Sequence, residues 1–171
     1  MSLSLDAEKR AKMLARWFDL IVDRYPAETA RFLREQRDPF ANPVGDGLRD
    51  ELAPLLDGVL DGRAPTELSS SLDRIVRVRA LQDMSPSQAV GFVLDLKTIF
   101  REVAGGATAD DVRCVDDRVD RLLLTAFDVF NRCREQLCEI RVSEIRNRSL
   151  KVMERLNEWR ERRAGGPPSN A

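Results

Sequence analysis

Four charged residues lie where helical periodicity expects apolar side chains. When the segment around residues 69–83 is drawn as a helix, Arg79 and Asp83 fall near the middle of the apolar face formed by Leu72, Ile75, Val76 and Ala80. In a longer helix later in the chain, Asp116 and Asp120 lie beside an apolar stripe of Val112, Val119, Leu123 and Phe127. Charges are rarely buried unless they are paired. These four residues are therefore the candidate site.

Three kinds of site are compatible with this set. Arg79 and Asp83 are four residues apart and can form an ion pair, while Asp116 and Asp120 could reach Arg79 or another basic residue across the core. Such a buried network would fix the packing of the helices without adding much net stability. A second possibility is a small pocket for an anionic or hydrophilic signal molecule. The third, proton transfer by the two aspartates, has no accompanying nucleophile, metal-ligand set or oxyanion donor.

The histidine and cysteine content restricts the chemistry further. The sequence has no histidine, which excludes histidine-ligated haem, Ser-His or Cys-His catalysis and histidine-based zinc sites. Cys114, Cys133 and Cys138 lack the spacing of a zinc or dithiol motif, so we expect reduced, mostly buried thiols, with a redox role as the alternative. We predict no catalytic residue, metal or cofactor, and a function other than that of an enzyme.

A second candidate site is a row of residues near the C-terminus. The row steps alternately by three and four positions, which is the spacing of the a and d seam of a coiled coil: Val142, Ile145, Ser149, Val152, Leu156 and Trp159. Charged residues of both signs flank it, as they flank two-stranded coiled coils. The sequence therefore predicts a dimer or partner seam here, and the alternative is that this row packs back on its own domain.

Helical periodicity and breaker residues place these sites on about six helices of an all-α fold. The predicted spans are 5–23, 27–36, 44–60, 69–81, 86–103 and 112–159, with Pro54 marking a kink or a late start of the third. Ser85-Pro86-Ser87-Gln88 carries the start signal of the fifth helix. Residues 37–45 predict an irregular loop whose Phe40 turns into the core, with a partner-facing aromatic as the alternative. We expect a helical sensor-like domain over 1–140, an extending signalling or dimerisation helix over 141–163 and a disordered tail over 164–171.

Composition narrows the class of partner. The chain has 171 residues with a formal net charge of -1, which argues against a dedicated nucleic-acid binder. Basic residues outnumber acidic ones between Arg132 and Arg163, but the interleaved glutamates favour a solvated face. No segment approaches the roughly 18 apolar residues that span a bilayer, and the charged N-terminus does not resemble a signal peptide. These features predict a cytoplasmic protein without nucleic-acid or membrane partners.

Three segments resemble the N-terminal sensor domain of RsbT co-antagonist proteins, the RsbRD N-terminal family. They are RDPFANPV at residues 37–44, IVRVRALQDMSPSQAVGF at 75–92 and DRVDRLLLTAFDVF at 117–130, and the middle one is the most specific. The resemblance covers roughly residues 14–148. It implies a globin-like helical bundle without haem, which dimerises and directs its C-terminal helix toward an output domain such as a STAS domain or a kinase.

This chain departs from the family pattern because no output domain follows its long helix. We therefore expect a non-enzymatic regulator that acts in trans, or a piece of a longer protein. The family resemblance supplies no catalytic residues. The leading hypothesis is a homodimeric sensor or adaptor that transmits a conformational signal through its C-terminal helix. The alternative is a module that binds a polar or anionic metabolite near Arg79 and Asp83.

Overall fold

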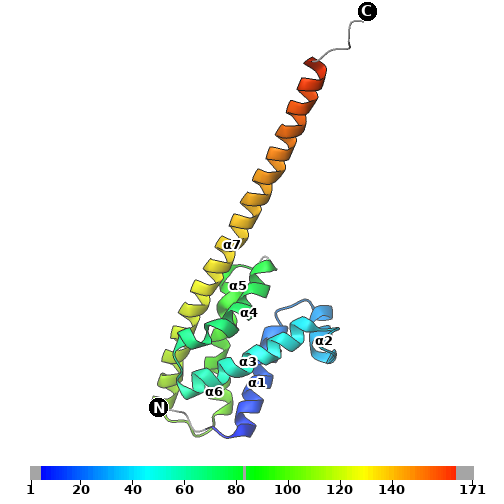
Figure 1. Cartoon of the computed structure of the whole chain (residues 1–171). Helices are drawn as coiled ribbons and strands as arrows, with labels where there is room; N and C mark the ends of the chain where they lie inside the picture. Colours follow the sequence, from blue (N-terminus) through cyan, green and yellow to red (C-terminus); the bar gives the residue numbers. More distant parts are fainter. Residues whose placement is uncertain (1–4, 83, 165–171) are drawn as a thin grey trace, which may run out of the picture. The chain divides into compact units, whose positions relative to one another are not determined.

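The structure is a computed structural model that describes residues 5–82 and 84–164, and every regular element within these ranges is a helix (Figure 1). The predicted all-α class is therefore confirmed. The chain divides into two compact units, Met1–Cys133 (unit 1) and Arg134–Ala171 (unit 2), and each is considered by itself. Asp83 and most of the tail predicted for residues 164–171 lie outside the described residues.

Unit 1 consists of short helices and the first part of a long one. The elements are α1 (Ala7–Val22), α2 (Ala27–Glu35), α3 (Pro43–Asp61), the 3-10 turn η1 (Pro65–Leu68), α4 (Ser69–Leu81), α5 (Pro86–Val90), the 3-10 turn η2 (Gly91–Leu94), α6 (Asp95–Val103) and α7 (Ala109–Ala164). Helix α1 packs against α3 and α6, and α3 packs against α4. Pro54 lies inside α3, so the late start considered for that helix is wrong.

The centre of unit 1 is built around Trp17 of α1. Its ring is fully buried and stacks on Phe92 with ring centroids 5.9 Å apart. The indole Nε1 donates a hydrogen bond of 2.7 Å to the Phe92 carbonyl, which satisfies the only polar atom of the side chain. Leucine, isoleucine and valine side chains of α3, α4, α6 and α7 complete the core. Trp17 thereby fixes α1 against the α5–α6 region.

The predicted fifth helix is divided. Its start is confirmed, because the Ser85 side chain accepts from the Gln88 amide while the Gln88 side chain accepts from the Ser85 amide. The α-helix then ends at Val90, and a 3-10 turn over Gly91–Leu94 separates it from α6. Glycine has a low helix propensity, and the Phe92 carbonyl is engaged by the Trp17 indole within this turn. The single helix predicted over residues 86–103 is therefore wrong.

The loop between α2 and α3 is fixed by Asn42 and not by Phe40. The Asn42 side chain is buried, and its Nδ2 donates to the carbonyls of Leu33 and Gln36 at 3.2 and 2.9 Å. Its Oδ1 accepts from the Gly45 amide at 2.9 Å, which caps α3. Phe40 is 96% exposed, so the prediction that it turns into the core is wrong. Three hydrogen bonds of Asn42 hold the loop without a hydrophobic anchor.

Helix α7 confirms the single helix predicted over residues 112–159. It begins after Thr108, whose hydroxyl accepts from the Asp111 amide at 3.1 Å. Its buried stripe in unit 1 differs from the predicted one and consists of Val115, Val119, Leu122, Ala126, Val129, Phe130 and Cys133. Of the four residues predicted for this stripe, only Val119 is buried, and Phe127 is 44% exposed. The core-facing side of α7 is therefore rotated from the predicted one.

The described residues also test three expectations, which concern buried thiols, membrane-spanning segments and metal sites. Cys133 is buried, Cys114 is intermediate and Cys138 is exposed, so the expectation of mostly buried thiols is wrong. None of the described helices combines the length and the apolar character needed to cross a bilayer. No group of three acidic or cysteine side chains among the described residues is arranged to hold a metal ion.

Candidate functional site

Arg79, in the last turn of α4, is buried with only 2% of its surface exposed. One guanidinium nitrogen, Nη2, donates to the Gln88 carbonyl at 3.1 Å. The guanidinium carbon lies 5.3 Å from the centroid of the Phe92 ring and 6.0 Å from that of Tyr25. Periodicity therefore placed Arg79 correctly on the buried face of its helix.

The remaining donors of this guanidinium find no acceptor in the described part of the chain. Nε and Nη1 are buried and have no hydrogen-bond partner among the described residues. Asp83, the partner suggested by sequence spacing, lies outside them. Burial lowers the pKa of Arg79, because removal from water disfavours the charged form, and the nearby Arg24 lowers it further. Arginine nevertheless stays charged in proteins, so α4 holds a buried cation with free donors.

A cavity of about 460 Å³ lies next to Arg79, between α3 and α4, and Arg79 contributes to its wall. The volume is within the range of small-molecule sites, about 300–1,000 Å³. Most of its remaining wall is aliphatic: Pro43, Val44, Gly47, Leu48, Ile75 and Val78. Tyr25, Asp50, Glu51 and Arg74 supply the other polar groups, and the last two form an ion pair of 2.5 Å with each other. We refer to this site as the Arg79 cavity.

Asp116 and Asp120 pair with basic residues on α6. Asp116 accepts from Arg101 at 2.5 Å, and Asp120 accepts from Lys97 at 2.6 Å. Neither forms an ion pair with Arg79, and Asp120 keeps 57% of its side chain exposed. Of the three predicted site residues that the structure describes, Arg79 thus lies at the cavity beside α4, and the two aspartates lie on the α6–α7 surface.

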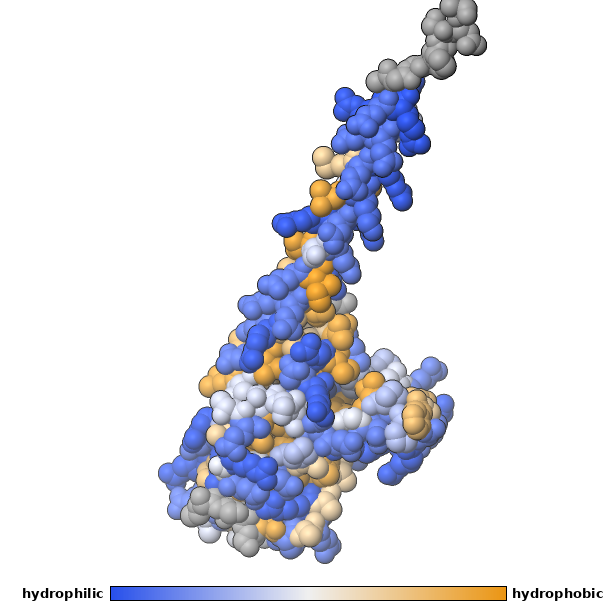
Figure 2. Space-filling view, viewed as in Figure 1, coloured by the Kyte–Doolittle hydropathy of each residue, from blue (hydrophilic) through white to orange (hydrophobic). Residues whose placement is uncertain are grey.

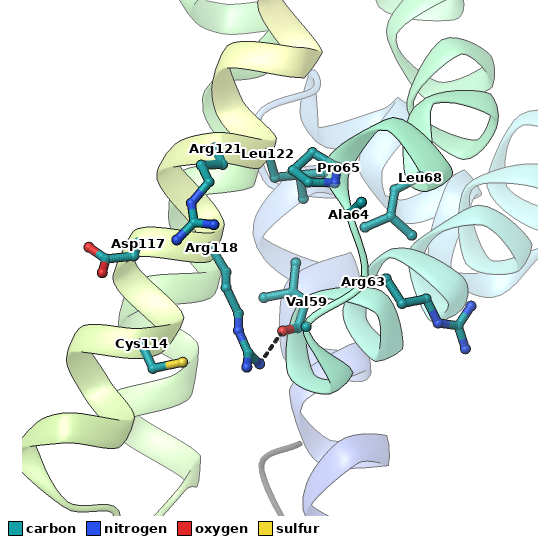
Figure 3. A pocket seen from close by; sticks show the side chains of 11 residues that line it. Val59, Arg63, Ala64, Pro65, Leu68, Cys114, Asp117, Arg118, Arg121 and Leu122 are labelled. Atoms are coloured by element: carbon teal, nitrogen blue, oxygen red, sulfur yellow. Dashed lines mark hydrogen bonds between the residues drawn. The ribbon is translucent and has the colours of Figure 1, made fainter. Parts of the chain in front are cut away.

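A second cavity, of about 480 Å³, lies where the α3–η1 turn meets α7 within unit 1 (Figure 3). Arg118 enters it from α7, and its Nη1 donates to the carbonyls of Val59 and Leu60 at 2.8 and 2.7 Å. Gly62 ends α3 with a positive φ of 75°, and a Cβ atom there would lie 2.8 Å from Arg118 Nη2. The arginine is therefore a cap for the last carbonyls of α3.

Sequence reasoning missed this second cavity, although one signal for it was present. Gly62 follows the apolar run of α3 and marks a helix C-terminus, whose last carbonyls need a donor. Nothing in the local sequence tells which distant arginine supplies it, because Arg118 is more than fifty positions away. The aliphatic wall of the Arg79 cavity was missed for a similar reason, since it is shared between α3 and α4.

The predicted seam belongs to unit 2, which by itself is a single helix. The seam residues Val142, Ile145, Val152, Leu156 and Trp159 are 50% to 66% exposed, and Ser149 is exposed among them. Figure 2 shows apolar side chains at intervals along this part of α7, between hydrophilic ones. A single helix gives these side chains no packing partner. The seam is therefore an unsatisfied apolar row.

The positions on either side of the seam carry mainly arginine. On one side these are Arg141, Arg148, Arg155 and Arg162, and on the other Arg146, Met153 and Arg160. The glutamates of the segment lie further out, where Glu158 pairs with Arg162 at 3.8 Å. Residues flanking a coiled-coil seam decide which helix can pair with it. The seam thus combines apolar attraction with a positive border.

Comparison with known proteins gives one family and one distant relative. Residues 11–144 match the family model described as the RsbT co-antagonist protein rsbRD N-terminal domain. An uncharacterized protein of Archaeoglobus fulgidus is 23% identical over 158 residues, which cover 90% of this chain and 95% of that protein. No solved structure matches the chain. The family match spans unit 1 and the beginning of unit 2.

Proposed function

Because the chain belongs to the family of RsbT co-antagonist protein RsbRD N-terminal domains, we propose that it is a sensor or adaptor that dimerises through α7 and passes a conformational signal to a protein partner. The family is one of regulatory signalling modules that work with protein partners, and it is not known as a family of enzymes. Dimerisation, the identity of the partner and action in trans are our proposal. A partner with a STAS or kinase-type output fits the family.

The observation that carries this proposal is the unsatisfied apolar row of unit 2. Five large apolar side chains at a and d spacing, each at least half exposed, favour pairing with a second helix. Helix α7 also contributes residues to both units, since Ala109–Cys133 belongs to unit 1 and the following residues belong to unit 2. A change in unit 1 that alters α7 can therefore reach the seam through the same helix.

The arginine residues beside the seam determine how the stability of such a dimer depends on salt. Two copies would bring like charges together beside the seam, which opposes pairing at low ionic strength. Salt screens exposed charges, with a Debye length of about 10 Å at 0.1 M. We therefore expect a weak dimer that becomes tighter as salt is added. A partner helix with acidic borders would behave in the opposite way, because salt would weaken its attraction.

Sedimentation velocity of matched variants tests the seam. Leu156→Asp places a charge within the row and should abolish dimers at tens of micromolar, since burying an unpaired charge costs several kcal/mol. Asn157→Asp adds the same charge one position away, outside the seam, and should leave the dimer intact. A wild-type monomer that Leu156→Asp leaves unchanged would remove the dimerisation proposal.

A second candidate function is small-molecule binding at the Arg79 cavity. Its support is specific, because a buried guanidinium with free donors lies beside a cavity of about 460 Å³. A ligand bound only to the folded protein at 100 times its dissociation constant adds about 2.7 kcal/mol of stability. Thermal shift against a library of small anions tests this function, and the absence of any stabilising compound would count against it.

A further inference from the structure

The Arg79 cavity has the charge balance of a site for a single negative charge. Four charged residues contribute to its wall, and Arg74 with Glu51 forms an ion pair that neutralises both. Asp50 is exposed, so water solvates its charge. Arg79 remains as the buried cation, with one N–H on Nε and two on Nη1 lacking an acceptor among the described residues. A ligand that satisfies this group needs oxygen acceptors and one negative charge.

The rest of the wall selects for an apolar body. Val44, Leu48 and Val78 contribute aliphatic surface to it, as does Ile75. Leu48 and Ile75 are buried, whereas Val44 is partly open to solvent. A ligand with short branched or linear hydrocarbon would cover this surface, while a hydrated sugar or a nucleotide would leave its hydroxyl groups against it without partners.

We propose that the Arg79 cavity binds a small aliphatic monocarboxylate, with the carboxylate against the Arg79 guanidinium and the hydrocarbon against the wall formed by α3 and α4. A carboxylate can accept an N–H from Nη1, which has no acceptor among the described residues; because Nη1 is buried, the side chains around it must shift for the ligand to reach it. A phosphate dianion suits the site less well, because no unpaired cation among the described wall residues is left to receive its second charge. This inference rests on the proposal that unit 1 is a binding module.

Tyr25 also contributes to the wall of the Arg79 cavity. The Tyr25 hydroxyl donates to the Gln82 side chain at 3.1 Å, and its ring lies within 6.0 Å of the Arg79 guanidinium carbon. Gln82 is exposed and Tyr25 is half-buried, so this hydrogen bond lies at the edge of the buried region that holds Arg79.

Isothermal titration calorimetry of the full chain with isovalerate, butyrate, isoamyl alcohol and inorganic phosphate tests the ligand class. We expect both carboxylates to bind, and the alcohol and phosphate to bind at least about tenfold more weakly, since hydrogen bonds to a charged group contribute roughly 1.5–3 kcal/mol. In Arg79→Met the carboxylates should lose about ten- to a hundredfold in affinity, on the same basis, and the weak binding of the alcohol should stay the same.

A second variant keeps the test decisive if Arg79→Met does not fold. Gly47 belongs to the cavity wall, and a Cβ atom there meets no other atom within 4 Å, so Gly47→Leu should fill the cavity without touching Arg79. Gly91 is equally open but is not part of the wall, which makes Gly91→Leu the matched control. Isovalerate should bind the Gly91 variant and fail to bind the Gly47 variant.

Different results would overturn the ligand class and the proposal that unit 1 is a binding module. If the alcohol or phosphate binds as tightly as the carboxylates, or if Arg79→Met and Gly47→Leu bind isovalerate as well as the wild type, the ligand class is wrong while a binding module elsewhere is retained. If none of the four probes binds, both the carboxylate site and its premise are overturned. Dimerisation through the seam is unaffected by either result.

Discussion

Replacing Arg79 by methionine should make the protein more stable when no ligand is present. The buried guanidinium makes one hydrogen bond, to the Gln88 carbonyl, and lies over the Phe92 ring, while Nε and Nη1 have no partner in the described part of the chain. Methionine has nearly the same length and has no charge to desolvate. This substitution therefore separates what Arg79 contributes to folding from what it contributes to binding.

Three contributions determine how much Arg79→Met changes the free energy of unfolding. Loss of the hydrogen bond costs about 1.5–3 kcal/mol, and loss of the contact with the ring costs about 0.5–2 kcal/mol. These losses are opposed by the desolvation penalty of the buried ion, which is several kcal/mol; for buried ion pairs, replacement by apolar residues is often neutral or stabilises proteins by about 1–4 kcal/mol with such losses included. We expect a net gain of about 1–3 kcal/mol. For a chain of this size that raises Tm by about 3–10 °C.

The assay is chemical and thermal unfolding followed by circular dichroism. Arg77→Met is the matched control, because Arg77 is exposed on the same helix and forms an exposed ion pair with Asp73 at 3.1 Å. Its effect should stay within about 0.5 kcal/mol. A loss of stability of more than about 2 kcal/mol in Arg79→Met would refute the reasoning, since it would mean that water or protein already satisfies the guanidinium.

Three further predictions concern the loop, the thiols and the start of α7. Asn42→Ala should lower the free energy of unfolding by about 2–4 kcal/mol because it removes three hydrogen bonds of a buried side chain. Urea titration measures this free energy, and a loss below about 0.5 kcal/mol would contradict the prediction. Cys138 is exposed and should react with a thiol reagent well before Cys133, because burial raises the pKa of the Cys133 thiol and Asp73 raises it further. Mass spectrometry of labelled peptides shows the order of reaction, and equal rates would refute this prediction. Thr108 donates from its amide and hydroxyl to Asp111, which lowers the pKa of that carboxyl below its usual value. The resulting stability is present above about pH 4 and is lost as the pH falls through the lowered pKa, so wild type and Asp111→Asn should differ at neutral pH and converge in acid.

The sequence predicted those features of the fold that depend on local chemistry. Helix starts with strong signals, such as Ser85 with Gln88, are in place because their hydrogen bonds lie within one turn. The burial of Arg79 was also predictable, since its neighbours at helical spacing are apolar. The family could not be predicted from local chemistry; it was predicted from the resemblance of three segments, and the match of the family model over residues 11–144 confirms it.

Features that depend on contacts between distant elements were not predictable in this way. Asp116 and Asp120 were expected to reach Arg79 or another basic residue, because periodicity assigns a face and not the helix that lies opposite. Lys97 and Arg101 of α6 are their partners, and Arg79 is not. Phe40 was expected in the core because it is aromatic, but Asn42 holds the loop. Its side chain donates to the carbonyls of Leu33 in α2 and of Gln36 just after α2, and the turn of the chain brings these carbonyls within reach. Within the interruption at Gly91–Leu94, the Phe92 carbonyl accepts from the indole of Trp17, which lies far away in the sequence.

Sedimentation equilibrium of the wild-type chain at tens of micromolar, in about 0.1 M and about 0.5 M NaCl, tests most directly whether α7 pairs two copies. We expect a mass that approaches twice the 19.4 kDa of one chain, with a smaller dissociation constant at the higher salt concentration because the arginine borders repel less. A mass of 19.4 kDa at both salt concentrations, or a dimer that dissociates as salt is added, would contradict it.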